Sequence, residues 1–113
     1  MKCDEIHLAS FPFGGSAGTK LRPVLLLTGP LGSVPEVLVA YISSVFPSAL
    51  LPTDIVLDPL TPEHAPTRLK TRSVLRLHKL ATVHTRSVVR RLGTIPQATS
   101  LDVKEKLRAM LDL

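Results

Sequence analysis

Hydrophobic and polar positions alternate with a period of two along most of the chain, which predicts short β-strands. Residues 21–29, "LRPVLLLTG", are apolar almost throughout, and a short run of this kind followed by Gly and Pro is typical of a buried central strand. The predicted strands cover residues 5–11, 21–29, 36–44, 53–58, 73–83 and 86–95. We therefore expect between five and seven strands.

The hydrophobic period changes after residues 86–95. Val103, Leu107, Met110 and Leu111 are spaced as i, i+4, i+7 and i+8, which predicts one apolar face of a helix. Thr99 stands three residues before Asp102 and resembles a capping box, so we expect the helix over residues 99–111. A helix this short must pack on the sheet to persist.

Turns, and not helices, separate the predicted strands, which favours an antiparallel sheet. The chain of 113 residues is thus expected to be a single, mainly β domain, a small and strongly bent antiparallel barrel with a C-terminal helix. Residues 14–19, "GGSAGT", are predicted as a hairpin loop, because they lack the Gly-Lys-hydroxyl element of a phosphate-binding loop. Residues 59–71 hold three prolines and are expected to be exposed.

Charge is unevenly distributed along the chain. Residues 1–63 hold three Lys or Arg against six Asp or Glu, whereas residues 64–101 hold eight Lys or Arg and no acid. The last twelve residues are balanced, so the net charge of +5 comes from the middle segment. Cations gathered on one surface favour a polyanion, because binding releases counterions from its phosphates. The alternative is that a small basic domain stays soluble through its charge.

Composition excludes several classes of function. The four aromatic residues, Phe11, Phe13, Tyr41 and Phe46, are too few for the stacking sheet face of an RNA-recognition motif. The single Cys3 cannot form an internal disulfide, and no Cys/His cluster has zinc-ligand spacing. No apolar run approaches the roughly 20 residues that span a bilayer, and the first ten residues lack the apolar core of a signal peptide. We expect a cytoplasmic protein with no membrane partner.

Lys20 and Arg22 place two cations against the apolar run of residues 21–29. One interpretation is solvation of a strand end. The other is that an anion docks at the mouth of this strand, where Pro23 stiffens the backbone beside Arg22.

Five segments follow one another in an order typical of one family. They are "FPFGGSAGTKLRPVLLL", "VLVAYISS", "LPTDIVL", "SVLRLHKLATVHTRSVVRRLG" and the C-terminal helix. The chain resembles, from about Asp4 to Leu111, the MazF/PemK family of toxin endoribonucleases. This resemblance implies an SH3-like or CcdB-like barrel, a homodimer, and metal-independent, sequence-specific cleavage of single-stranded mRNA by 2′-hydroxyl attack, with no cofactor. It also implies a cognate antitoxin whose acidic, initially disordered tail occupies the RNA groove.

The same resemblance assigns catalytic residues. Arg22 matches the family's catalytic arginine, and Ser43 matches a hydroxyl residue at a strand end, which could equally cap a backbone group. Arg76 and His78, two residues apart in one strand, match an arginine and an acid. The acid is replaced here by His78, and a second acid by His84. His78 can act as base or acid, or have no catalytic role.

Lys20, Ser44, Arg72 and Lys79 are expected to contact RNA. The apolar stretch of residues 45–52, "VFPSALLP", is the expected contact with a second subunit. Two other functions stay open. One is a catalytically silent barrel that binds an acidic peptide or another protein, and the other is a general single-strand nucleic-acid binder, which the shortage of aromatics disfavours.

Overall fold

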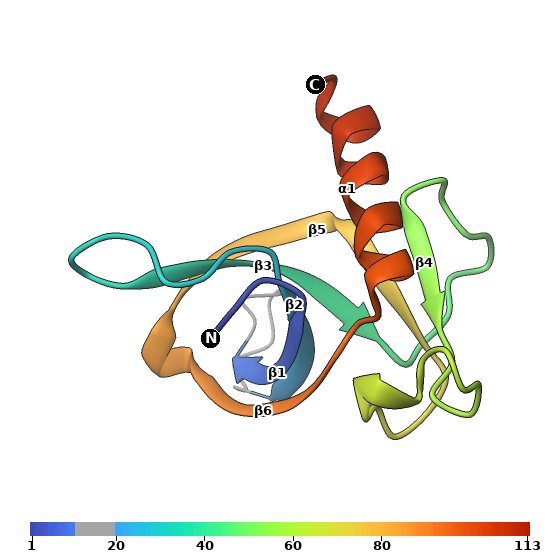
Figure 1. Ribbon diagram of the computed structural model, residues 1–113, viewed down its shortest axis with the longest axis horizontal. Coiled ribbons are helices and arrows are strands. Elements are labelled where there is room, and N and C mark those ends of the chain that lie inside the picture. Colours follow the sequence, from blue (N-terminus) through green and yellow to red (C-terminus); the bar gives the residue numbers. More distant parts are fainter. Residues whose placement is uncertain (11–19) are drawn as a thin grey trace.

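The computed structural model describes residues 1–10 and 20–113; the glycine-rich loop predicted for residues 14–19 lies outside them (Figure 1). The described elements are β1 (Glu5–Ser10), β2 (Leu21–Leu26), β3 (Glu36–Ser43), β4 (Asp54–Leu57), the 3₁₀ turn η1 (Ala65–Thr67), β5 (Ser73–His84), the 3₁₀ turn η2 (Thr85–Ser87), β6 (Val88–Thr94) and α1 (Gln97–Leu111). The prediction of five to seven strands and a C-terminal helix is confirmed.

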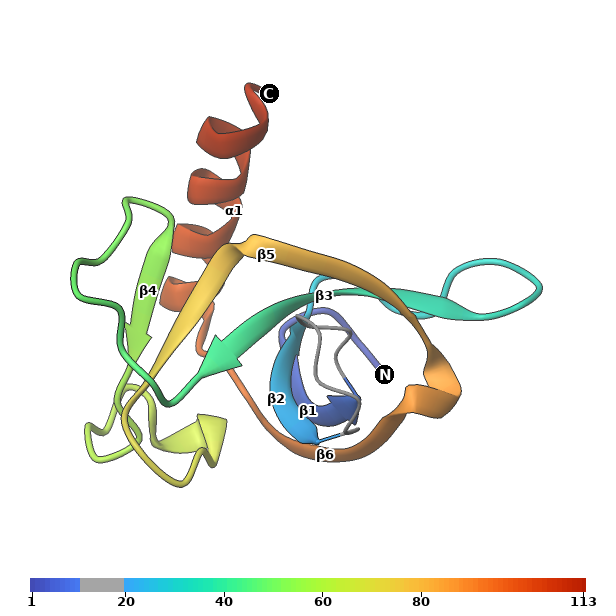
Figure 2. The ribbon, with the colours of Figure 1, turned by 180° about the vertical axis from the view of Figure 1, so that it is seen from behind.

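The strands form one antiparallel sheet with the order β4-β5-β3-β2-β1-β6. The sheet curls around an interior, so that β6 passes on the opposite side of β1 and β2 from β3 and β5 (Figures 1 and 2). None of the described ladders joins β4 to β6. The predicted antiparallel fold class is therefore correct, but the barrel stays open along a seam between its two edge strands.

Both faces of the central strands are buried, which explains the nearly continuous apolar run in β2. Leu25 belongs to one apolar cluster, which continues to Ile42 and to Val103 of α1. Val24 and Leu26 point to the other face and belong to a second cluster. Each fully buried Val or Leu side chain stabilises the fold by about 1.5–3 kcal/mol. The sheet is thus a rigid support for the residues at its strand ends.

Helix α1 begins at Gln97, so the capping-box prediction for Thr99 was wrong. Pro96 occupies the N-cap position with φ −70°, and no side chain caps the helix there. Proline suits a helix entry, because its fixed φ favours the turn into the helix and its missing N–H leaves no donor unpaired. Thr99 instead faces the segment before η1, since its Oγ1 lies 3.2 Å from Nε2 of His64.

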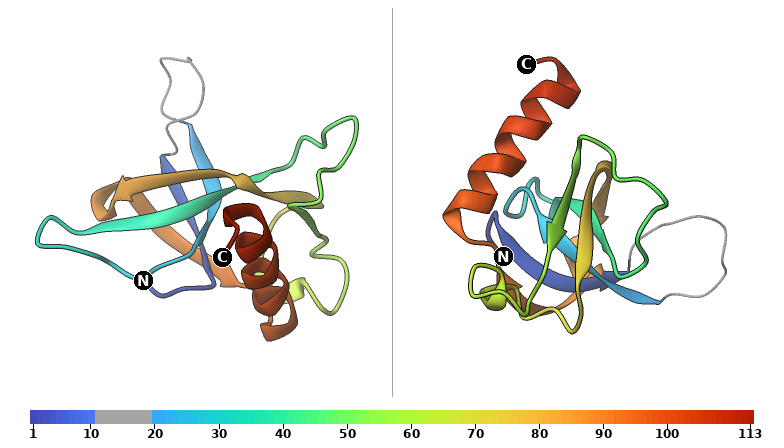
Figure 3. Two further views of the ribbon diagram at one scale, coloured as in Figure 1. Left: turned by 90° about the horizontal axis from the view of Figure 1, so that it is seen from above. Right: turned by 90° about the vertical axis from the view of Figure 1, so that its right-hand side faces the viewer.

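The first turns of α1 hold the helix to the sheet. Ser100 Oγ donates a hydrogen bond of 2.7 Å to Asp4 Oδ2, and Val103 is 2% exposed. The later turns extend away from the sheet towards the C-terminus (Figure 3). Among the described residues, we find no membrane-spanning helix, since α1 has only 15 residues.

Near the open seam, the backbones of β6 and η1 approach each other closely. A Cβ built on Gly93 would fall on the carbonyl oxygens of Pro66 and Thr67. Thr67 is fully buried, and its hydroxyl donates a 2.7 Å hydrogen bond to the carbonyl of His64. Only glycine permits this approach, which sets the residues after η1 beside β6.

The Gly93→Ala substitution should destabilise the protein by about 2–3 kcal/mol, because the added methyl group must push η1 away from β6. The free energy of unfolding in urea measures this effect. Gly29→Ala is the matched control, since its Cβ would meet only the Met1 carbonyl oxygen at an ordinary 3.5 Å. Equal midpoints for the two variants would contradict the role of this contact.

Candidate functional site

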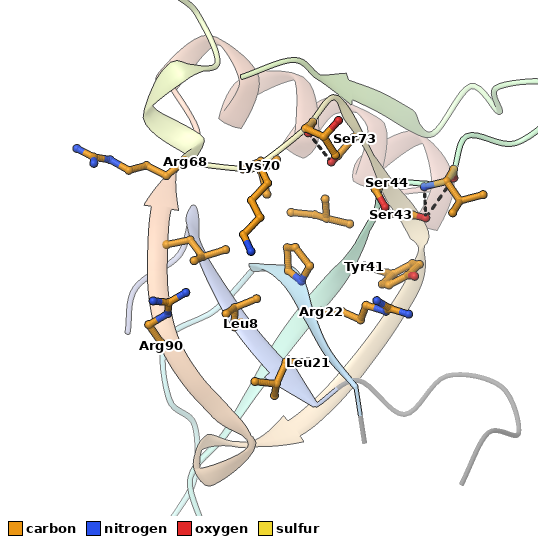
Figure 4. Close-up of a pocket in the computed structure, with 16 residues that line it drawn as sticks. Leu8, Leu21, Arg22, Tyr41, Ser43, Ser44, Arg68, Lys70, Ser73 and Arg90 are labelled. Carbon is orange, nitrogen blue, oxygen red and sulfur yellow. Dashed lines mark hydrogen bonds between the residues drawn. The ribbon is translucent and has the colours of Figure 1, made fainter. Parts of the chain in front are cut away.

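A groove of about 500 Å³ opens where the ends of β1, β2 and β3 meet β6 and residues 68–73 (Figure 4). Its apolar lining includes Leu8 from β1, Leu21 and Pro23 from β2, and Ile42 from β3. These residues come from adjacent strands, because Leu8 and Pro23 are direct partners in the β1–β2 ladder. The groove therefore has a rigid, apolar floor.

Four cationic residues contribute to the groove lining. Arg22 comes from β2, Arg68 and Lys70 from the segment after η1, and Arg90 from β6. In Figure 4, Arg22 lies beside one edge of the groove and Arg90 beside the opposite edge, while Lys70 extends its ammonium group between them. Among the described residues that line the groove, none is acidic. The groove thus favours an anion, and its low-dielectric floor strengthens the attraction.

Arg22 lies near the start of β2 and lines the groove. It is the second residue of β2 and is exposed, and it pairs with Ala9 across the ladder. Its neighbour Pro23 has a fixed φ and packs in the groove floor, so the backbone that carries Arg22 has little freedom.

Arg68 occupies a backbone position that normally favours glycine. It follows η1 with φ 56° and ψ 26°, and its N–H donates a 3.2 Å bond to the Ala65 carbonyl. A left-handed conformation costs a non-glycine residue roughly 1–2 kcal/mol. The chain therefore carries an arginine here despite a local cost in stability, and in Figure 4 its guanidinium points outward from the groove.

The hydroxyl of Ser43 is engaged by the turn that follows β3. It donates a 3.1 Å hydrogen bond to the Val45 carbonyl and accepts a 3.1 Å bond from the Val45 N–H. These bonds are those of the strand-end cap that the sequence left open as an alternative. Ser44, by contrast, is exposed on the groove wall.

Arg76 is held by a buried carboxylate. Its Nε lies 3.2 Å from Asp54 Oδ1, and its Nη2 lies 3.4 Å from Asp54 Oδ2. The Asp54 side chain is 0% exposed and also accepts a 2.8 Å bond from the Leu51 N–H. Arg76 pairs in register with Tyr41, which lines the groove, but Arg76 itself does not. Arg76 therefore lies outside the groove lining, next to Tyr41 in the β3–β5 ladder.

His78 lies at an irregularity of β5. Ala40 of β3 pairs with Leu80 of β5, whereas the next residue, Tyr41, pairs with Arg76. Residues 77–79 of β5 therefore lie between two consecutive residue pairs and form a bulge. His78 is the middle one of these and is exposed. Bulges of this kind are frequent beside active sites, where they redirect a side chain. The next residue, Lys79, places Nζ 5.7 Å from the centroid of the Tyr41 ring.

Arg91 follows Arg90 in β6, but its side chain belongs to a cluster with Glu5 and His7. Its Nε lies 3.3 Å from Glu5 Oε2, and His7 Nε2 lies 3.0 Å from Glu5 Oε1. The hydrogen bond from His7 lowers the pKa of Glu5 below its ordinary value of 4.5. Glu5 thus forms an ion pair with Arg91, and Arg90 is the cation of β6 that lines the groove.

The structure brings three of the predicted residues into the groove lining, namely Arg22, Ser43 and Ser44. The others lie outside it: Lys20, Arg72, Arg76, His78 and Lys79. Groove residues that the sequence did not assign to the site include Tyr41, Arg68, Lys70 and Arg90. For the three cations the signal was the acid-free basic segment of residues 64–101, whereas Tyr41 lies outside that segment. Nowhere in residues 1–10 and 20–113 do three His, Cys, Asp or Glu side chains gather to hold a metal ion.

Comparisons with known proteins agree with this architecture. Toxin MazF-mt6 of Mycobacterium tuberculosis has a TM-score of 0.72 at 24% identity, covering 96% of this chain and 97% of that chain. MazF of Deinococcus radiodurans has a TM-score of 0.70 at 18% identity, covering 100% and 97%. An endoribonuclease in complex with its cognate antitoxin, from a mycobacterial species, has a TM-score of 0.72 at 14% identity, covering 100% and 96%.

At these identities the solved structures establish the fold, and no curated protein sequence matches the chain. Membership rests on the family model described as "PemK-like, MazF-like toxin of type II toxin-antitoxin system", which matches residues 2–111. The resemblance carried by the five segments is confirmed, and the chain belongs to the PemK-like, MazF-like toxins of type II toxin–antitoxin systems.

Proposed function

We propose that the protein is an endoribonuclease toxin that cuts single-stranded mRNA in this groove without a metal ion. One observation carries the proposal: Arg22, Lys70 and Arg90 border an apolar floor, and the described lining holds no acid. The cations suit the phosphates of RNA, and the apolar floor suits the faces of unpaired bases. Similar folds named as endoribonucleases are consistent with this activity.

Cleavage without a metal ion uses the 2′-hydroxyl beside the scissile phosphate as nucleophile. A bond forms between this oxygen and phosphorus, the bond from phosphorus to the 5′-oxygen breaks, and the products are a 2′,3′-cyclic phosphate and a 5′-hydroxyl. The nucleophile must lose a proton and the leaving oxygen must gain one. Negative charge builds up on the phosphorane oxygens between these events, and a fixed cation stabilises it.

Arg22 is the residue that we assign to the phosphorane. Its guanidinium can hold two phosphate oxygens at once, and the strand fixes its base. Ser43 holds the turn after β3 through its two bonds to Val45, and this turn presents the exposed Ser44 hydroxyl to the phosphate or ribose. Lys70 supplies a second charge from the middle of the groove.

Proton transfer is assigned to His78, with Arg76 beside it. The described groove lining holds neither a histidine nor a carboxylate. An ordinary proton acceptor must therefore come from a residue outside this lining. His78 is two residues after Arg76, whose ladder partner Tyr41 lines the groove. Asp54 fixes the guanidinium of Arg76, which then acts by its charge and position.

Replacing Arg22 should test the catalytic proposal. The Arg22→Ala variant should cut a mixed-sequence RNA about 10²–10³-fold more slowly than the wild type, because the phosphorane loses its cation. The assay contains EDTA and identifies fragments that end in 2′,3′-cyclic phosphate. Arg86→Ala is the control, since Arg86 lies in η2 and does not line the groove. A wild type that cuts no RNA, or an Arg22→Ala variant that cuts at full rate, would reject the proposal.

Replacing His78 should separate proton transfer from folding. His78→Ala should lower kcat by about 10²–10⁴-fold with little change in KM or stability, because the side chain is exposed. The pH–rate profile should lose one of its limbs in this variant. His84→Ala is the matched control, since the His84 ring accepts the Arg86 N–H at the other end of β5. An unchanged kcat in His78→Ala would remove His78 from the mechanism and leave the role of Arg22 intact.

A second candidate function is a binding module without turnover. The lack of a histidine or carboxylate in the described lining favours it, because binding needs only the cations. An acidic, disordered antitoxin tail would fold onto the same cations that RNA uses, so we propose that a cognate antitoxin competes with RNA for the groove. An acidic peptide that binds tightly to a wild type without RNA cleavage would establish the module in place of the enzyme.

We also propose that the protein is a homodimer that uses the far end of the loop between β3 and β4. Leu50 and Leu51 are 50% and 43% exposed there. Sedimentation at micromolar concentration should show a species of twice the 12.3 kDa chain mass, and Leu50→Asp should shift it to the monomer. Leu60→Asp is the control, because Leu60 is 91% exposed in another loop. A wild type that sediments only at 12.3 kDa would contradict the dimer.

A further inference from the structure

Two aromatic side chains lie within the described residues, Tyr41 and Phe46, and both stand at the end of β3 or just after it. Each has a cation over its ring. Lys79 Nζ lies 5.7 Å from the Tyr41 centroid, and Arg72 Cζ lies 4.4 Å from the Phe46 centroid. These aromatic residues, too few for a stacking sheet face, are thus gathered at one end of the groove.

The Arg72–Phe46 pair is carried by two segments whose neighbouring residues line the groove. Ser44 and Val45, which precede Phe46, line the groove. Thr71 and Ser73, on either side of Arg72, line it as well. Phe46 and Arg72 are themselves not part of the lining. A polymer that leaves the groove past these lining residues would meet the pair as its next contact.

Arg72 differs from the arginines that hold the fold together. Arg76 is bound by Asp54 and Arg91 by Glu5, whereas the ion pairs within the described residues include none for Arg72. Its side chain is exposed, while Phe46 is half-buried and anchored by its loop. The ring therefore supports a guanidinium whose outer surface faces solvent. Because the ring already restricts this side chain, binding to it loses less conformational entropy.

A planar cation backed by an aromatic ring has two chemical uses for RNA. Unpaired bases stack on guanidinium planes and on aromatic faces, and the charge attracts the adjoining phosphate. We infer that Arg72 is a stacking platform for one unpaired base of the RNA, next to the nucleotides in the groove, and that Phe46 is its positioning residue. This inference rests on the proposed function, since it takes RNA as the occupant of the groove.

The test uses an RNA oligonucleotide with one cleavage site, either intact or lacking the base at each neighbouring position in turn. Removal of the base at one position should lower kcat/KM of the wild type about tenfold. Arg72→Ala should lose about the same factor on intact RNA and nothing further when that base is missing. Such a coupled loss identifies the contact, because a variant with a general folding defect would lose activity on every substrate.

Conservative variants separate stacking from charge. Arg72→Lys keeps the charge but not the plane, so it should behave like Arg72→Ala towards the missing base. Phe46→Tyr should retain the wild-type discrimination, and Phe46→Leu should lose it, with thermal unfolding as a check on the fold of each variant. Arg86→Ala is the control for the loss of an exposed arginine. If Arg72→Lys discriminates as well as the wild type, Arg72 acts through charge alone and the platform is rejected.

Binding is measured separately, by fluorescence anisotropy with the same oligonucleotides carrying 2′-deoxyribose at the cleavage site. If the wild type binds but does not cut intact RNA, the proposed enzyme fails, and the platform is judged from the effect of the missing base on affinity. If it cuts RNA with no position dependent on Arg72, the platform is overturned and the enzyme stands. If it neither binds nor cuts RNA, both are overturned.

Discussion

The close approach of Gly93 to the carbonyl oxygens of Pro66 and Thr67 joins the edge strand β6 to η1, at the side of the curled sheet where none of the described ladders connects β6 to β4. This contact needs a residue without a side chain, since any Cβ would overlap the backbone of η1. It brings Lys70 opposite the floor formed by β1 and β2. The groove is lined by the residues that follow η1 and by β6, so both sides of this contact continue into its lining.

Charge in the basic segment is divided between structural and available cations. Arg76 and Arg91 are taken up by Asp54 and Glu5, respectively, and these pairs tie β5 to β4 and β6 to β1. The Asp54 carboxylate is fully buried, so it needs both Arg76 and the Leu51 N–H to offset its desolvation. Arg22 and Lys70, by contrast, face a groove without acids in its described lining. The net positive charge is thus concentrated where an anion can reach it.

The site combines side chains that hold the backbone in place with side chains that are exposed to a ligand. Ser43 uses its hydroxyl to hold the turn after β3, and this turn fixes Ser44 and Val45 at the rim. The same turn leads directly to Phe46, whose ring carries Arg72. Contact of Ser44 with the phosphate or ribose and base recognition beyond the rim would therefore share one short structural element, while Arg22 is placed by β2. A shared element of this kind would align the backbone and the bases of a single RNA strand.

The sequence by itself determined the type of the elements with a range of five to seven strands, the antiparallel class, the family, and the place of Arg22 at the start of a strand. These features depend on local periodicity, on turn residues and on the order of motifs, which neighbouring residues along the chain encode. Tertiary structure alone decided which cations form ion pairs within the protein and which line the groove. It also decided that Thr99 contacts His64 and does not cap α1, and that Gly93 approaches the backbone of η1. Each of these depends on groups at least 22 residues apart in the chain, as Asp54 and Arg76 are, and local patterns carry no information about such pairs.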